Sequence, residues 1–199
     1  MVVPADRTDS RRMSFDIAPW HLHKAGAALA AGGVIACPTE AVWGLSCDPM
    51  NRAACMRLLE IKQRDWRKGL ILVAAAFEQL PLFVDLPSNN AMRRATATWP
   101  GPATWIFPAA ADAPPWLTGD HDGIAVRVTA HPLMRSLCRR FGALVSTSAN
   151  RSGRPAARSI TEVRLQLGGE VDMIIPGALG GLAKPTTIRD VMTGHILRR

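Results

Sequence analysis

Hydrophobic residues occur along this chain in two alternating kinds of run. Apolar positions three and four residues apart predict helices over residues 19–31, 91–99, 131–141 and 161–167, and over a segment that Asn51 can cap and that ends near Lys62. Short apolar or alternating runs predict strands over residues 34–37, 70–74, 104–107, 124–128, 143–147, 173–175 and 187–192. This order predicts an α/β domain with a mixed, twisted sheet and flanking helices. The pattern leaves the strand order open.

The first predicted strand runs directly into a polar segment. Pro38 is expected to break the strand, so that residues 39–48 form a loop at its carboxyl end. Open α/β sheets bind ligands at such ends. Thr39 and Glu40 would offer polar groups there, and Trp43 an aromatic face. The alternative is a plain turn with Trp43 packed into the core.

Three cations gather near the end of the second predicted helix. The chain has 24 Lys and Arg residues, and only four of them are lysines. Two of these, Lys62 and Lys68, flank Arg64, and a compact ammonium suits a phosphate. The cluster would neutralise a polyphosphate and a leaving pyrophosphate. The alternative is a solvated helix end whose basic side chains complement the helix dipole.

A second polar motif, Ser148 and Asn150, follows the strand predicted over residues 143–147. Short polar side chains and free backbone N–H groups at such a position can hold phosphate or ribose oxygens. Local turn chemistry, with Asn150 as a cap, explains the same residues equally well.

Composition sets the remaining bounds. A chain of 199 residues fits one domain or at most two small ones. Residues 1–13 are polar and are expected to form a disordered tail before a domain of residues 14–199. No apolar run approaches membrane-spanning length and no secretory signal precedes the domain, which predicts a cytoplasmic protein without a membrane partner. The four cysteines lack metal-ligand spacing and are expected to be small buried hydrophobes.

The formal net charge of +8 favours anionic partners such as nucleotides or RNA. A compositional bias toward Ala, Arg and Pro explains that charge equally well.

Taken together, these segments resemble the YrdC-like threonylcarbamoyl-AMP synthase family, most closely its short bacterial, TsaC-type form. The matching segments are residues 38–40, Gly44 with 47–49, and residues 58–64, 68–72, 99–104, 125–128, 146–150 and 185–190. The resemblance implies a twisted sheet around a deep basic cavity. It also implies synthesis of threonylcarbamoyl-adenylate and pyrophosphate from L-threonine, bicarbonate and ATP. The product would serve modification of tRNA beside the anticodon, through the transfer machinery.

The resemblance also implies roles for individual residues. The catalytic cations would be Lys62 and Arg64. The residues expected around ATP are Lys62, Arg64, Thr104, Ser148 and Asn150. The residues expected around threonine are Thr39, Lys68, Arg127 and Thr186. Mg²⁺ would arrive with ATP, without protein side chains as ligands.

Three positions depart from the family pattern. Trp43 stands where longer forms usually have tyrosine, Asp65 where proline is common, and Thr186 where serine is frequent. Two other functions stay open at this point: a basic RNA-binding module without chemistry, and a carbamoyl-adenylate enzyme with another acceptor.

Overall fold

Helices and strands alternate along the computed structural model, which describes residues 17–198. The predicted tail of residues 1–13 lies outside the described residues. The helices are α1 (Pro19–Ala30), α2 (Arg52–Lys62), α3 (Asn89–Thr96), α4 (Pro115–Thr118), α5 (Pro132–Phe141) and α6 (Ile160–Leu167). Two 3-10 turns are η1 (Trp66–Lys68) and η2 (Phe77–Gln79). The helix predictions are confirmed to within a few residues, whereas α4 was predicted as part of a connection.

The strands form two mixed sheets rather than one. They are β1 (Ile35–Pro38), β2 (Trp43–Ser46), β3 (Ile71–Ala74), β4 (Ala103–Pro108), β5 (Gly123–Val128), β6 (Leu144–Val145), β7 (Thr147–Ser148), β8 (Met173–Ile174), β9 (Thr187–Asp190) and β10 (Ile196–Arg198). A four-stranded sheet has the order β7-β2-β1-β8, and a six-stranded sheet has the order β10-β9-β4-β5-β3-β6. Parallel and antiparallel pairs occur in both. The α/β class is therefore confirmed.

Local chemistry accounts for several helix ends. Pro19 opens α1 from a position where the missing N–H costs nothing. The side chain of Asn51 accepts a hydrogen bond from the Ala54 N–H at 3.0 Å and so caps α2, as predicted. Ser159 caps α6 through the Glu162 N–H at 3.1 Å.

The predicted loop over residues 39–48 is wrong in part, because β2 lies within it. β1 and β2 form an antiparallel hairpin whose register places Pro38 opposite Trp43. Pro38 does not break this pairing, because it is the last residue of β1 and β8 pairs only with Ile35 and Ala36. The turn shrinks to residues 39–42.

The single strand predicted over residues 143–147 is also wrong. Its apolar half, β6, pairs with β3 in the six-stranded sheet. Its polar half, β7, pairs with β2 in the four-stranded sheet. The chain therefore passes from one sheet to the other at Ser146, whose N–H donates to the Ile71 carbonyl at 2.8 Å. β10 was not predicted at all.

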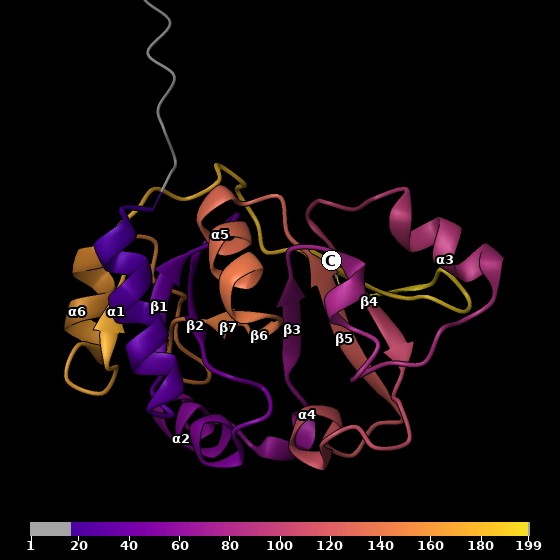
Figure 1. The fold of residues 1–199 in the computed structure, drawn as a ribbon, viewed down its shortest axis with the longest axis horizontal. Coiled ribbons are helices and arrows are strands. Elements are labelled where there is room, and N and C mark those ends of the chain that lie inside the picture. Colours follow the sequence, from indigo (N-terminus) through magenta and orange to yellow (C-terminus); the bar gives the residue numbers. More distant parts are fainter. Residues whose placement is uncertain (1–16, 199) are drawn as a thin grey trace, which may run out of the picture.

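Two apolar clusters hold the layers together. Helices α1 and α5 lie over β1 and β3 on one face (Figure 1), and their residues form one cluster. The larger cluster lies among α2, α3, α6 and both sheets. All four cysteines are free and buried, as expected. Within residues 17–198, no helix combines the length and apolar character needed to cross a membrane.

Candidate functional site

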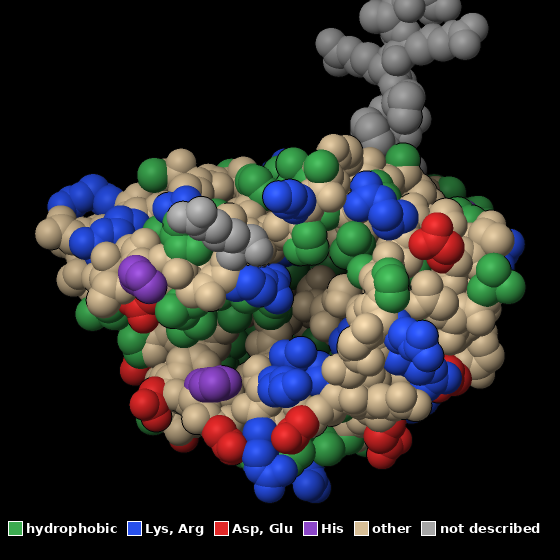
Figure 2. All heavy atoms as spheres, turned by 180° about the vertical axis from the view of Figure 1, so that it is seen from behind, with side chains coloured by type: hydrophobic (Ala, Val, Ile, Leu, Met, Phe, Trp, Pro, Cys, Tyr) green, Lys and Arg blue, Asp and Glu red, His purple; other side chains and the backbone are tan. Residues whose placement is uncertain are grey.

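The face opposite to α5 is hollowed at its centre, and Lys and Arg side chains stand around the opening (Figure 2). A cavity of about 450 Å³ is lined by residues of both sheets. Its basic lining residues are Lys62, Arg64, Arg127, Arg154 and Arg198. Glu40 is the carboxylate among its lining residues, so cations dominate the described wall.

Lys62 ends α2 and is only 3% exposed. Its ammonium donates to the carbonyl of Ser148, to the carbonyl of Asn150 at 2.9 Å and to Asn150 Oδ1 at 3.2 Å. Burial lowers the pKa of Lys62 to about 8, and the neighbouring Arg64 acts in the same direction. Lys62 therefore reaches the cavity as a buried cation that holds the loop after β7.

The loop after β7 is also tied together by its own side chains. Ser148 Oγ donates to Asn150 Oδ1 at 2.6 Å. The amide of Asn150 donates to the carbonyls of Arg151 and Arg154 at 3.0 and 2.6 Å. Asn150 thus serves the turn, as the alternative interpretation held, while Ser148 and Asn150 both line the cavity. The structure brings Lys62, Ser148 and Asn150 into one hydrogen-bonded unit.

Arg64 lies between this cavity and a second one of about 540 Å³. Its Nη2 donates to the carbonyls of Lys68 and Gly69 at 3.4 and 3.3 Å. Burial lowers the pKa of Arg64, and the nearby Arg198 contributes to the shift. Arg198 belongs to β10 and also lines both cavities.

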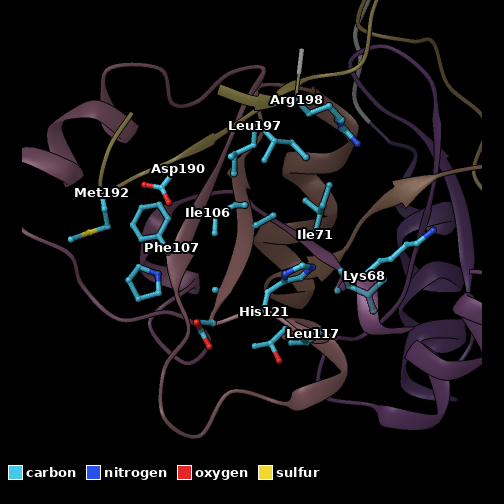
Figure 3. Close-up of a pocket in the computed structure, with 18 of the residues that line it drawn as sticks. Lys68, Ile71, Ile106, Phe107, Leu117, His121, Asp190, Met192, Leu197 and Arg198 are labelled. Carbon is cyan, nitrogen blue, oxygen red and sulfur yellow. The ribbon is translucent and has the colours of Figure 1, made fainter. Parts of the chain in front are cut away.

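Of the predicted residues, Lys68 shares a cavity only with Arg64, and it does not line the first cavity. It is exposed and borders the second cavity, whose wall is largely apolar (Figure 3). Figure 3 places Lys68 on the opposite side of that cavity from Asp190 and Met192. Lys68 and Thr39, which were both predicted to bind threonine, therefore line different cavities.

Arg127 and Thr186 meet at the inner wall of the first cavity. Arg127 Nη1 donates to Thr186 Oγ1 at 3.0 Å, and both side chains are buried. Thr104 is fully buried, with its Oγ1 at 3.1 Å from that of Thr186, and lines neither of the two cavities. Thr39 lines the first cavity, and its hydroxyl donates to the Val42 carbonyl at 2.7 Å. Thr104 thus contacts Thr186 without lining either cavity.

The burial of Trp43 decides between a ring that faces a ligand and a ring packed in the core. The residue is 2% exposed and belongs to the larger core cluster. The prediction that its ring offers a face to a ligand is therefore wrong, and the core alternative is right. The main-chain N–H of Trp43 donates to the Ala157 carbonyl at 2.8 Å, and the main-chain carbonyl of Trp43 accepts from the Ala149 N–H at 2.7 Å.

Three charged residues of this wall, Glu40, Arg154 and Arg198, were not predicted as site residues from the sequence. Arg198 lies in a strand that the periodicity did not predict. Glu40 was noted beside Thr39 but given no role, although it is 6% exposed and lies 3.2 Å from Arg127. The position of Glu40 beside Thr39, directly after the first predicted strand, was the available signal in the sequence.

The described part of the chain contains no cluster of side chains suited to a metal ion. Within residues 17–198 no group of three or more His, Cys, Asp or Glu residues could hold one. Glu40 is already committed to Arg127 and Thr129. The cavity wall can instead bind anionic oxygens, because it combines cations with hydroxyl and amide groups.

Known proteins are similar to this chain over most of its length. A Sua5/YciO/YrdC family model, whose description reads "Telomere recombination", matches residues 27–199. A threonylcarbamoyl-AMP synthase of Xanthomonas campestris pv. campestris is 52% identical over 180 residues, which are 89% of this chain and 96% of that protein. Another from Halorhodospira halophila is 53% identical over 183 residues, 91% and 95% of the two chains.

A solved structure extends this similarity to three dimensions. The crystal structure of P. abyssi Sua5 complexed with L-threonine matches with a TM-score of 0.84 at 30% identity. The match covers 91% of this chain and 54% of the Sua5 chain, so this chain spans about half of that protein.

Proposed function

Since the chain belongs to the Sua5/YciO/YrdC family, we propose that it is an enzyme that makes threonylcarbamoyl-adenylate and pyrophosphate from L-threonine, bicarbonate and ATP. Two threonylcarbamoyl-AMP synthases are about half identical to it over nearly their whole length. The observation that carries the proposal is the basic cavity between the sheets, where Lys62, the loop after β7 and the Arg127–Thr186 pair face one space.

We assign the lining residues of the cavity to two substrates. Lys62, Arg64, Ser148 and Asn150 would hold the phosphates of ATP, because cations and short polar groups lie there together. Mg²⁺ would enter with ATP and screen the phosphate charge.

Three other lining residues would hold threonine. Thr39 and Thr186 offer hydroxyl groups, and Arg127 offers a guanidinium for a carboxylate or carbamate. We retain Lys68 and Thr104 as weaker candidates, Lys68 at the neighbouring cavity and Thr104 acting through Thr186.

The chemistry then needs positioning more than a protein nucleophile. The threonine amine combines with CO₂, supplied by bicarbonate, and loses a proton to become a carbamate. A carbamate oxygen attacks the α-phosphorus, and the bond to the leaving pyrophosphate breaks. Because negative charge gathers on the leaving group, fixed cations at its site lower the barrier. Lys62 contributes both its own charge and the geometry of the loop it holds.

The product determines the partners that we propose. Threonylcarbamoyl-adenylate would supply the group for N6-threonylcarbamoyladenosine beside the anticodon, through a transferase that takes the product and acts on tRNA in the cytoplasm. The net charge of +8 is compatible with tRNA as a direct partner.

Pyrophosphate release from Mg-ATP and bicarbonate, with and without L-threonine, tests the proposal. We expect release to require both threonine and bicarbonate, and Lys62→Ala to reduce it by about a hundredfold or more. The matched control is Lys24→Ala, because Lys24 is an exposed lysine on α1 that does not line the cavity. Threonine-independent release, or none from folded protein, would overturn the assignment; RNA binding that survives Lys62→Ala would then favour a binding module.

A further inference from the structure

One acidic side chain lies in the wall of a cavity that otherwise attracts anions. Glu40 is 6% exposed and comes from the turn between β1 and β2. A free carboxylate at this place would repel ATP, threonine carboxylate and carbamate alike. Its charge is paired instead, although among the described residues Oε2 lies in an ion pair without accepting a hydrogen bond. Glu40 Oε1 accepts from Thr129 Oγ1 at 2.5 Å, and Oε2 lies 3.2 Å from Arg127 Nη2.

Arg127 is thereby held from two sides. Its Nη2 faces Glu40 from the four-stranded sheet, and its Nη1 donates to Thr186 from the segment before β9. Arg127 itself belongs to β5 of the six-stranded sheet, so the contact with Glu40 joins the two sheets across the cavity. Its Nε is buried without a hydrogen-bond partner among the described residues. The guanidinium is thus fixed in place and retains an unused donor.

The main chain at Glu40 is fixed as well. The Gly180 N–H donates to the Thr39 carbonyl at 3.0 Å, and the Leu182 N–H donates to the Glu40 carbonyl at 2.9 Å. A Cβ on Gly180 would lie 2.9 Å from Glu40 Cα, so the two segments are in direct backbone contact. Because its backbone cannot shift easily, Glu40 sets where the guanidinium of Arg127 can lie.

We propose that Glu40 is a positioning residue that holds the guanidinium of Arg127 in place to bind the carboxylate of the amino-acid substrate. The inference rests on the proposed function, and it gives that site a determinant of threonine binding. A bidentate guanidinium recognises a planar carboxylate only when its orientation is set, so loss of the anchor weakens that contact first.

A contribution to the stability of the fold does not by itself explain the buried Glu40–Arg127 ion pair. A buried ion pair is often no more stabilising than apolar residues of similar volume, because both charges lose their hydration. The decisive measurement must therefore follow substrate binding as well as folding.

Glu40→Gln removes the charge and keeps the shape. We expect the KM for L-threonine to rise at least about tenfold while the KM for ATP stays within about twofold, and calorimetry to show the same loss of threonine affinity. The matched control is Glu78→Gln, because Glu78 is exposed on η2 and lines neither cavity. An unchanged KM for threonine in folded Glu40→Gln overturns the inference. A fall in kcat without a change in KM also overturns it, since it would place Glu40 at the reacting atoms.

A double-variant comparison separates positioning from an independent effect. If Glu40 acts through Arg127, the Glu40→Gln/Arg127→Gln protein binds threonine no more weakly than Arg127→Gln alone. Additive losses overturn the inference. Should Glu40→Gln fail to fold, Thr129→Val decides, because it leaves the ion pair and removes the hydroxyl that fixes Oε1. We expect a smaller rise in the KM for threonine, about threefold, and no rise overturns the inference.

Failure of the proposed function would look different. It would appear in the unmodified protein, as an absence of threonine-dependent pyrophosphate release. The inference about Glu40 is judged only from the variants of an active enzyme.

Discussion

Lys62 is a buried cation, so burial opposes the charge of its ammonium. Its ammonium is almost fully buried, yet its hydrogen bonds all go to Ser148 and Asn150. Such a lysine gives up its proton more readily than an exposed one. Its charge therefore depends on pH in a range close to neutrality.

The titration of Lys62 predicts how stability changes with pH. Its pKa is about 8 in the folded protein, below the ordinary value of 10.5 that applies when the chain is unfolded. Between these values the unfolded chain binds more protons, so the free energy of unfolding rises with pH through this group. We expect the stability of the unmodified protein to gain on that of Lys62→Met between pH 7.5 and 10 in urea titrations. Parallel pH curves for the two proteins would contradict the lowered pKa.

At the scale of the element, the end of α2 decides where two cations go. Gln63 follows the helix in the left-handed region, with φ of 50° and ψ of 48°. The Arg64 N–H then donates back to the Leu59 carbonyl at 3.0 Å, which closes the helix end. This reversal lets Lys62 reach the loop after β7 while Arg64 lies against Lys68 and Gly69.

The backbone of Gln63 predicts a stabilising substitution. A side chain in the left-handed region costs about 1–2 kcal/mol, which exceeds the entropic cost of glycine. We expect Gln63→Gly to raise the free energy of unfolding by about 0.5–1 kcal/mol, measured by urea denaturation. Gln63→Ala is the control, because it removes the same polar group and keeps a Cβ. Equal stability of the two variants would show that conformation is not the cause.

At the scale of the whole molecule, two sheets share one core and enclose the site on one face. α1 and α5 lie over β1 and β3 on the face turned to the viewer in Figure 1, and the hollow opens on the opposite face, shown in Figure 2. The four cysteines lie in the two apolar clusters. Cys37 of β1 and Cys138 of α5 belong to the smaller cluster, and Cys47 and Cys55 belong to the larger one.

Thiol reactivity reports on the integrity of this packing. Burial raises the pKa of Cys37 and of Cys138 to about 12. The pKa of Cys47 is raised by its contact with Cys55 and by burial. Since the thiolate is the reactive form, we expect a disulfide reagent to label none of the four thiols in native protein at pH 8, and all four after denaturation. Rapid labelling of native protein would contradict the packing of both clusters.

Much of the fold could be predicted from local patterns. Apolar periodicity located α1, α2, α5 and β5, because each buries one stripe or one run. The Asn51 cap was readable for the same reason, since donor and acceptor are three residues apart. The single strand predicted over residues 143–147 failed because its two parts, β6 and β7, pair with distant strands of different sheets. β2 and β10 were also missed, although each pairs with the strand that precedes it in the chain.

The sequence by itself determined which elements form and which polar motifs the chain carries, including Lys62, Arg64, Ser148 and Asn150. Their joining was decided by tertiary structure, because Lys62 meets Asn150 across 88 positions of the chain. The same holds for Glu40, in the turn between β1 and β2, and Arg127 of β5, which meet only when the two sheets pack. Local propensity sets helices, strands and caps through near neighbours, whereas the charge and hydrogen bonding of a buried side chain depend on segments that folding brings to it.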